Sequence, residues 1–92
     1  MTISNRWTIC FERRAFKELS KLDRSIQKKI HTFLHEKVIP AHDPKQFAKP
    51  LSANLKNFWR FRVEDFRLIC HIQDNTLTIV IVRIAHRRTV YD

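Results

Sequence analysis

Arginines alternate with large apolar residues in the stretch NFWRFRVEDFRLICHI, residues 57–72. Arg60 and Arg62 hold alternate positions in its first half, and Arg67 follows after an acidic pair. Successive side chains of a strand point to opposite faces, so this spacing predicts a sheet with apolar residues on one face and guanidinium groups on the other. Like charges on neighbouring strands repel, and the cost falls when something negative lies across them. The predicted open face is therefore suited to an anion.

A second polar group follows the last predicted strand, in the tail IAHRRTVYD, residues 84–92. It contains His86, Arg87, Arg88 and Tyr91. Arginine binds phosphate oxygens bidentately and stays charged, and fixed cations stabilise the negative charge that develops when a phosphodiester is cleaved. Tyr91 could stack on a base or accept a proton. The combination predicts a site for a scissile phosphate, although strand arginines often only solvate a face and a terminal tyrosine often only packs.

The charge balance favours a polyanionic partner. Eighteen Lys and Arg oppose nine Asp and Glu, for a net charge of +9 and a pI near 10.3. Such a field attracts nucleic acid first and acidic protein second. We expect no membrane association, because no helix-length segment is purely apolar and no lipidation motif is present. The N-terminal MTISNRWTICF alternates like a strand, so we expect no signal peptide and a cytoplasmic protein.

The elements that must position these residues follow from periodicity. Residues 6–11 alternate as a strand, and residues 12–22 place Ala15, Phe16, Leu19 and Leu22 at helical spacing. Asp23 can cap a second helix, which Pro40 ends. The apolar stripe of that helix comprises Ile26, Ile30, Phe33, Leu34 and Val38.

The second half of the chain reads as β structure. Strands are predicted at 58–63, 66–72 and 77–84, with a brief strand at 48–51 inside a proline-containing loop. The last strand is apolar on both faces, as a central strand would be. We therefore predict a single α+β domain, residues 1–92, with an N-terminal strand, a two-helix hairpin and an antiparallel meander. The helices should pack on one face, against Trp59, Phe61, Phe66 and Leu68.

Other residue types restrict the chemistry. The chain has no glycine, which excludes a glycine-rich phosphate loop and leaves Asn and Asp for turns with positive φ. Cys10 and Cys70 lie in apolar runs and are expected to be buried free thiols. His31 and His35 are four residues apart, but no third ligand is evident, so we expect no metal and no cofactor.

Taken together, these segments resemble a known family. The span FWRFRVEDFRLICHIQDNTLTIVIVRIAHRRTVY looks like the C-terminal half of the RelE/ParE superfamily of bacterial toxins. In that superfamily a basic-aromatic strand precedes a YR-[LI]-[IVL] strand, an apolar strand and a tail of the form HRR-x-VY. The N-terminal FERRAFKELSKLD resembles the family's A-x-K-x-x-x-K-L opening. The resemblance covers nearly the whole chain and implies the RelE-like microbial RNase fold.

For the RelE branch, the resemblance implies an mRNA interferase. Such an endoribonuclease enters the ribosomal A site and cleaves mRNA without metal, by attack of a ribose 2′-hydroxyl on the adjacent phosphate. Arg60 and Arg62 match the family's RNA-contacting basic pair, which is often lysine, and Arg67 matches the arginine that holds the phosphate. Arg87 matches the tail arginine that stabilises the transition state, and Tyr91 matches the tyrosine that orients or deprotonates the nucleophile.

Further residues are expected to support the site. His86 and Arg88 would make additional RNA contacts, and Lys28, Lys29 and Lys37 would either grip ribosomal RNA or form a solvated helix face. Arginine is a poor proton carrier, so a proton acceptor would have to be Tyr91 or His86. Many family members continue into a further C-terminal helix, whereas this sequence stops one residue after Tyr91.

The resemblance also implies partners: a cognate antitoxin, the ribosome with its mRNA, and operator DNA reached only through the antitoxin. Two alternatives stay open from the sequence. The ParE branch shares the fold but poisons DNA gyrase without RNase chemistry. A non-catalytic module could instead use the same arginines to bind RNA or the ribosome.

Overall fold

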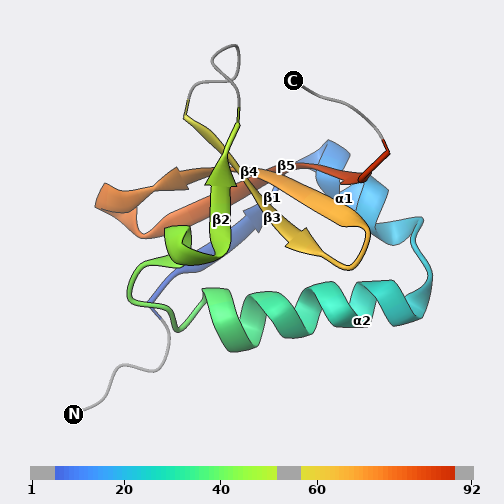
Figure 1. Ribbon diagram of the computed structural model, residues 1–92, viewed down its shortest axis with the longest axis horizontal. Helices are drawn as coiled ribbons and strands as arrows, with labels where there is room; N and C mark the ends of the chain where they lie inside the picture. The colour runs from blue at the N-terminus through green and yellow to red at the C-terminus, as the bar shows by residue number, and fades with distance from the viewer. Residues whose placement is uncertain (1–5, 52–56, 89–92) are drawn as a thin grey trace.

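The computed structural model describes residues 6–51 and 57–88 (Figure 1). Its sheet has five strands in the order β1-β5-β4-β3-β2. The strands are β1 Thr8–Phe11, β2 Ala48–Pro50, β3 Phe58–Val63, β4 Phe66–Gln73 and β5 Thr78–His86. The helices are α1 Arg13–Ser20 and α2 Arg24–Phe33, which runs on into the π-helical turn η1 Leu34–Val38. Short 3-10 turns are η2 Pro44–Phe47 and η4 Asp74–Thr76.

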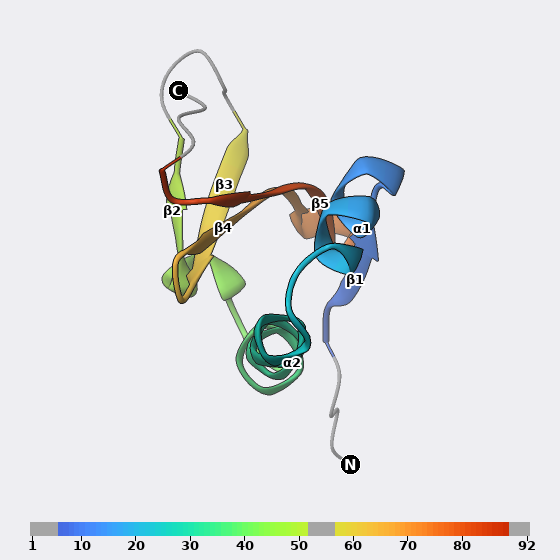
Figure 2. The same cartoon turned by 90° about the vertical axis from the view of Figure 1, so that its right-hand side faces the viewer.

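The predicted α+β architecture is confirmed. Strands β2 to β5 pair antiparallel, and β1 joins the sheet parallel to β5. As expected, β5 is an interior strand, with β1 and β4 as its neighbours. Figure 2 shows α2 running beneath the sheet and α1 lying at its β1–β5 end. No helix in the described stretches has the length and apolar character needed to cross a lipid bilayer.

The core forms where the sequence predicted it. Phe61 and Leu68 face each other across β3 and β4 and are fully buried. The helical stripe meets them through Ile30, Leu34 and Val38, all of which are buried in the same cluster. Trp59 and Phe66 pack against this cluster while remaining partly exposed. The alternation of β3 therefore turns Trp59 and Phe61 inward and its arginines outward.

Two expectations about the N-terminal segment were wrong. Phe16 is 59% exposed, because α1 turns only Ala15, Leu19 and the following Leu22 toward the core. Cys10 is also exposed. It alternates with Ile9 and Phe11, whose side chains pack against the core, so its own side chain takes the other face of β1.

The two thiols should differ sharply in reactivity. Cys70 is buried, and desolvation raises the pKa of its thiol to about 12, whereas Cys10 is exposed. Because the thiolate is the reactive form, we expect one cysteine per native chain to react with a thiol reagent at neutral pH, and two after denaturation. Peptide mapping should find the native label on Cys10. Rapid native labelling of Cys70 would contradict the burial.

Positive φ occurs at one residue type that was expected and at two that were not. Positive φ occurs at Asn57, as predicted for a chain without glycine, but also at Glu64 and Leu77. Glu64 opens the tight turn between β3 and β4, and Leu77 takes the left-handed conformation between η4 and β5 with φ 49° and ψ 46°. A leucine in this region is strained, because its Cβ approaches the neighbouring carbonyl oxygen.

Replacing Leu77 by asparagine should therefore stabilise the fold. Asparagine tolerates the left-handed region, and the exposed Leu77 side chain contributes little burial, so we expect the free energy of unfolding to rise by about 0.5–1 kcal/mol. Urea denaturation measures the change. Leu77→Gln is the matched control, since it is polar but has no left-handed preference. If the free energy of unfolding rises equally in both variants, the cause is the loss of an exposed apolar side chain and not the relief of backbone strain.

Candidate functional site

The predicted strand arginines share the face of the sheet opposite to the core. Arg62 of β3 lies directly across from Arg67 of β4, and Arg60 lies across from Ile69. Arg62 is exposed, and Arg60 and Arg67 are partly exposed. A like-charged pair directly opposite in a sheet costs roughly 0.2–1 kcal/mol. An anion between Arg62 and Arg67 would remove that cost.

Two cations that the sequence reasoning missed complete this surface. Lys49 of β2 pairs with Arg60, and Arg83 of β5 pairs with Ile69, so both join the arginine side of the sheet. Lys49 was missed because β2 is short and its register cannot be read from its own sequence. We call the following five residues the basic face: Lys49, Arg60, Arg62, Arg67 and Arg83.

A β-bulge gives Arg83 its orientation. The pairing of β4 with β5 shifts from Ile69 opposite Arg83 to Cys70 opposite Ile81, which leaves Val82 as an extra residue. Strict alternation from the buried Ile81 would have sent Arg83 into the core. The extra residue reverses the phase, so Arg83 joins the basic face. A charged residue inside an apolar strand was the signal that could have indicated such a bulge.

The basic face has an apolar floor. Ile69 and Ala85 lie on this side of the sheet, away from the core cluster, yet they are only 4% and 7% exposed. Ile69 stands between Arg60 and Arg83 in one cross-strand row, and Ala85 stands next to Arg67 in the adjacent row. Arginine covers apolar surface with its aliphatic stem and keeps its charged head in water. The guanidinium groups are thereby held above the strands.

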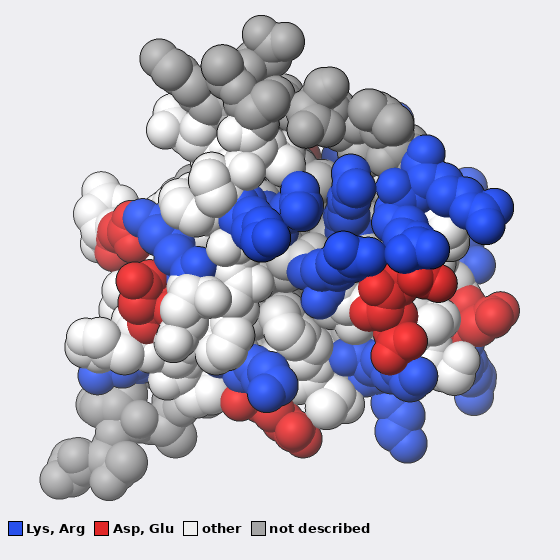
Figure 3. Space-filling view, viewed as in Figure 1, with Lys and Arg blue, Asp and Glu red and all other residues white. Residues whose placement is uncertain are grey.

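The basic face has little local acid to neutralise it. Among the ion pairs of the described residues, none involves Arg60, Arg62 or Arg67, whereas Arg83 of the same face pairs with Glu18. Figure 3 shows Lys and Arg gathered in a band across the upper half of the visible surface, with acidic side chains at its left-hand end, below its right-hand end and at the bottom of the molecule. Neighbouring positive charges without counter-charges produce a strong local potential for anions.

Arg87 continues the pairing of β5 with β4 by one residue beyond the end of β5. It follows Ala85 by two residues, and its backbone N–H donates to the carbonyl oxygen of Asp65 at 2.6 Å. Its Nε lies 3.6 Å from a carboxylate oxygen of Asp65, with both side chains at least half exposed. An exposed ion pair of this kind is weak, so an incoming phosphate can compete for the Arg87 guanidinium.

The remaining tail residues take different positions. His86 lies across from Phe66, with the two rings edge to face and 5.4 Å between centroids, so its ring lies on the helix side of the sheet. Arg88 is exposed, and its backbone N–H donates to Nδ1 of His86 at 3.2 Å. Tyr91 lies outside the described residues. The structure therefore places Arg87 at the end of β5 beside Asp65 and places the ring of His86 away from the basic face.

The helix lysines form a separate surface. Lys28, Lys29 and Lys37 are all exposed and line a hollow of about 370 Å³ beside Phe33 and Val63. Lys29 Nζ lies 3.4 Å from a carboxylate oxygen of Glu64. Because α2 and η1 pack on the core side of the sheet, these lysines are not part of the basic face.

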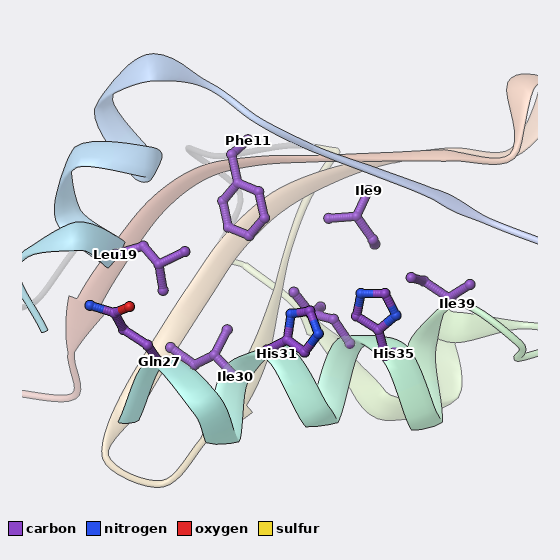
Figure 4. A pocket seen from close by; sticks show the side chains of 9 residues that line it. Ile9, Phe11, Leu19, Gln27, Ile30, His31, His35 and Ile39 are labelled. Carbon is purple, nitrogen blue, oxygen red and sulfur yellow. The ribbon is translucent and has the colours of Figure 1, made fainter. Parts of the chain in front are cut away.

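A groove runs between β1 and α2 (Figure 4). Ile9 and Phe11 point into it from β1, and His31 and His35 point toward it from the helix, with their rings 4.1 Å apart. The groove encloses about 290 Å³, and a neighbouring hollow that shares His31 is also lined by Arg24 and Lys28, with no carboxylate. The groove is thus lined mainly by apolar side chains, with Gln27, His31 and His35 among them, and is basic beyond one end.

Comparisons with known proteins agree with this fold. The family model described as "ParE toxin of type II toxin-antitoxin system, parDE" matches residues 9–91. The chain therefore belongs to the RelE/ParE superfamily and is a toxin of a type II toxin-antitoxin system.

The individual proteins that resemble this chain have names of the RelE type. The chain is 29% identical to Toxin RelG of Mycobacterium tuberculosis over 85 residues, which cover 92% of this chain and 95% of that toxin. It also matches a chain of the RelBE2 toxin-antitoxin complex from Mycobacterium tuberculosis with a TM-score of 0.80 and 27% identity, covering 97% and 100% of the two chains. The intact RelBE complex of E. coli shows the same fold at 16% identity, with a TM-score of 0.68 over 87% of this chain and 95% of that one.

Proposed function

We propose that this toxin is a metal-independent mRNA interferase that cleaves mRNA in the ribosomal A site, and that it acts in the cytoplasm. The observation that carries the proposal is the Arg62–Arg67 pair, two opposed cations without an acidic partner in the described part of the chain. A bridging phosphate would make charge-assisted hydrogen bonds to both guanidinium groups. The likeness to Toxin RelG supports the RelE branch.

The proposed reaction is transfer within the RNA chain. The ribose 2′-oxygen bonds to the neighbouring phosphorus, and the bond from phosphorus to the 5′-oxygen of the next nucleotide breaks. Arg60 and Arg62 hold the RNA backbone, and Arg67 binds the scissile phosphate. Arg87 stabilises the charge on the phosphoryl and leaving oxygens. Tyr91, as its phenolate, orients the 2′-hydroxyl and accepts its proton. The leaving 5′-oxygen takes up a proton from water, and the cleaved strand ends in a 2′,3′-cyclic phosphate.

Tyr91 is preferred to His86 as the proton acceptor. Nδ1 of His86 already accepts a hydrogen bond from the Arg88 backbone, and the ring packs on Phe66. His86 and Arg88 then serve as supporting residues at the end of β5. Lys28, Lys29 and Lys37 are proposed to contact ribosomal RNA phosphates, because their ammonium groups are exposed on a surface separate from the scissile site.

A cognate antitoxin is the proposed partner that restrains this activity. Structurally similar chains occur in toxin-antitoxin complexes, including the RelE-RelB complex of Pyrococcus horikoshii OT3, which has a TM-score of 0.67 and 18% identity over 92% of this chain and 99% of that one. The groove between β1 and α2 fits an antitoxin segment with apolar residues followed by acidic ones, because Arg24 and Lys28 stand beyond its end. Operator DNA would be reached only through the antitoxin.

Inhibition of DNA gyrase is the second candidate, since the matching family model is described by ParE. Parallel assays separate the two functions. The interferase should stop protein synthesis in a reconstituted translation reaction and leave gyrase-driven supercoiling unchanged. Inhibited supercoiling with normal translation would contradict the interferase proposal and show that the toxin inhibits gyrase. Blocked translation with intact mRNA would instead indicate a non-catalytic ribosome binder.

A further inference from the structure

An acidic side chain reaches the basic face from outside the sheet. Strand β1 ends at Phe11, so the second half of β5 has no strand beside its outer edge. Helix α1 lies there instead (Figure 2). Its Glu18 contacts that edge at the backbone of Ile84. One carboxylate oxygen of Glu18 accepts a hydrogen bond from the backbone N–H of Ile84 at 2.7 Å. The other accepts a hydrogen bond from Nε of Arg83 at 3.0 Å.

This arrangement differs from the surface ion pairs elsewhere on the molecule. The side chains of Glu18 and Arg83 are only 24% and 23% exposed, whereas those of the Arg87–Asp65 pair are 60% and 51% exposed for the carboxylate and the guanidinium. A partly buried carboxylate that accepts two hydrogen bonds is held in place. Because one of these bonds is to the backbone of β5, Glu18 fixes the position of the Arg83 guanidinium relative to the strand.

Two independent features therefore determine where Arg83 points. The bulge at Val82 turns Arg83 onto the basic face, and Glu18 holds the guanidinium at Nε. Across the sheet, Arg83 shares its row with Arg60, separated by Ile69. We infer that Arg83 is a further phosphate-binding residue for a single-stranded RNA substrate, and that Glu18 is its positioning residue. This inference rests on the proposed function, because it assigns another contact on the same surface.

If Glu18 positions Arg83, removing the charge of Glu18 should weaken RNA binding, whereas the change in net charge alone would strengthen it. Replacing Glu18 by glutamine raises the net charge above +9 by one unit, so a non-specific attraction would bind RNA more tightly. If Glu18 positions Arg83, the neutral amide holds the guanidinium less firmly. RNA binding should then weaken although the protein has become more positive.

The experiment measures binding of a short labelled single-stranded RNA oligonucleotide as a function of salt. Full 2′-O-methylation removes the nucleophile, so the probe cannot be cleaved by the proposed reaction. Arg83→Gln should weaken binding by about tenfold at low salt and reduce the log–log salt slope by about 0.7, as expected for one lost phosphate contact. Glu18→Gln should weaken binding by about threefold, since charge-assisted hydrogen bonds are about twice as strong as neutral ones.

Matched variants separate positioning from structure. Glu36→Gln makes the same charge change at an exposed site on η1 and should bind RNA at least as tightly as the wild type. In an Arg83→Gln background, Glu18→Gln should have no further effect on binding, whereas a purely structural defect would persist. Thermal unfolding of each variant establishes that the folded protein is being compared.

Several results would overturn the inference. Tighter RNA binding by Glu18→Gln would contradict the positioning role of Glu18. An unchanged salt slope in Arg83→Gln would contradict phosphate binding by Arg83. Absence of salt-dependent binding by the wild type would show that the basic face does not bind RNA phosphates. Normal RNA binding with the expected variant effects, but no mRNA cleavage, would remove the proposed reaction and leave Arg83 as a phosphate-binding residue.

Discussion

Replacing Arg67 by alanine is expected to lower the rate of mRNA cleavage by about 100-fold to 1000-fold, the usual effect of removing a fixed group that stabilises transition-state charge. Arg67 stands beside Arg62 on the basic face, and its side of the strand is outside the core cluster. The fold should therefore survive the change. Single-turnover cleavage of ribosome-bound mRNA measures the rate, and thermal unfolding measures the stability.

The control for Arg67 is Arg24→Ala. Arg24 is an exposed cation at the start of α2, so the substitution removes the same charge from a surface away from the basic face. Its cleavage rate should remain within a few-fold of the wild type. If folded Arg67→Ala protein cleaves as fast as the wild type, the proposed phosphate site on β3 and β4 is wrong.

Replacing Phe61 by alanine should cause the largest loss of stability. Phe61 has no exposed surface, faces Leu68 across the sheet, and makes an edge-to-face contact with Phe33 of α2 at 5.7 Å between ring centroids. Removing a buried phenyl ring leaves a cavity and costs about 3–5 kcal/mol. Urea denaturation should show this decrease in the free energy of unfolding, which is a large fraction of the stability of a small domain.

Phe16→Ala is the matched control, because it removes the same ring from a position that is 59% exposed. Its free energy of unfolding should change by only about 0.5 kcal/mol. Similar losses for Phe61→Ala and Phe16→Ala would contradict the assignment of Phe61 to the core.

Alternation along the strands predicted much of this organisation. The alternation of Trp59, Phe61 and Val63 with Arg60 and Arg62 places the arginines on the face opposite to these apolar residues, and β3 has that arrangement. The second helix was equally readable, because a stripe at 3.6-residue spacing buries Ile30 with the sheet. In both cases local periodicity and tertiary packing require the same orientation.

Long-range pairing could not be predicted in the same way. Lys49 joins the basic face because β2 pairs with β3 in a register fixed across the intervening loop. Arg83 joins it because an extra residue changes the phase of β5. The register of β2 is not visible in the residues next to Lys49, and the apolar residues around Arg83 indicate a bulge without giving its position. The partner of Arg83, Glu18, is 65 positions away and belongs to a different element.

Backbone strain was also missed. The absence of glycine predicted Asn or Asp wherever φ is positive, but tight connections between paired strands impose that conformation on Glu64 and Leu77. The register of the flanking strands outweighs the local preference of these residues, since shifting either strand by one residue would turn its core side chains outward.

The central claim is that the basic face and the tail tyrosine cleave mRNA on the ribosome. Its most direct test is mapping of mRNA ends by primer extension in a translation reaction that contains wild-type protein or the Tyr91→Phe variant. We expect new mRNA ends at codon positions with the wild type, only when ribosomes are present, and no such ends with Tyr91→Phe. Identical cleavage by the two proteins, or no cleavage by the wild type, would contradict it.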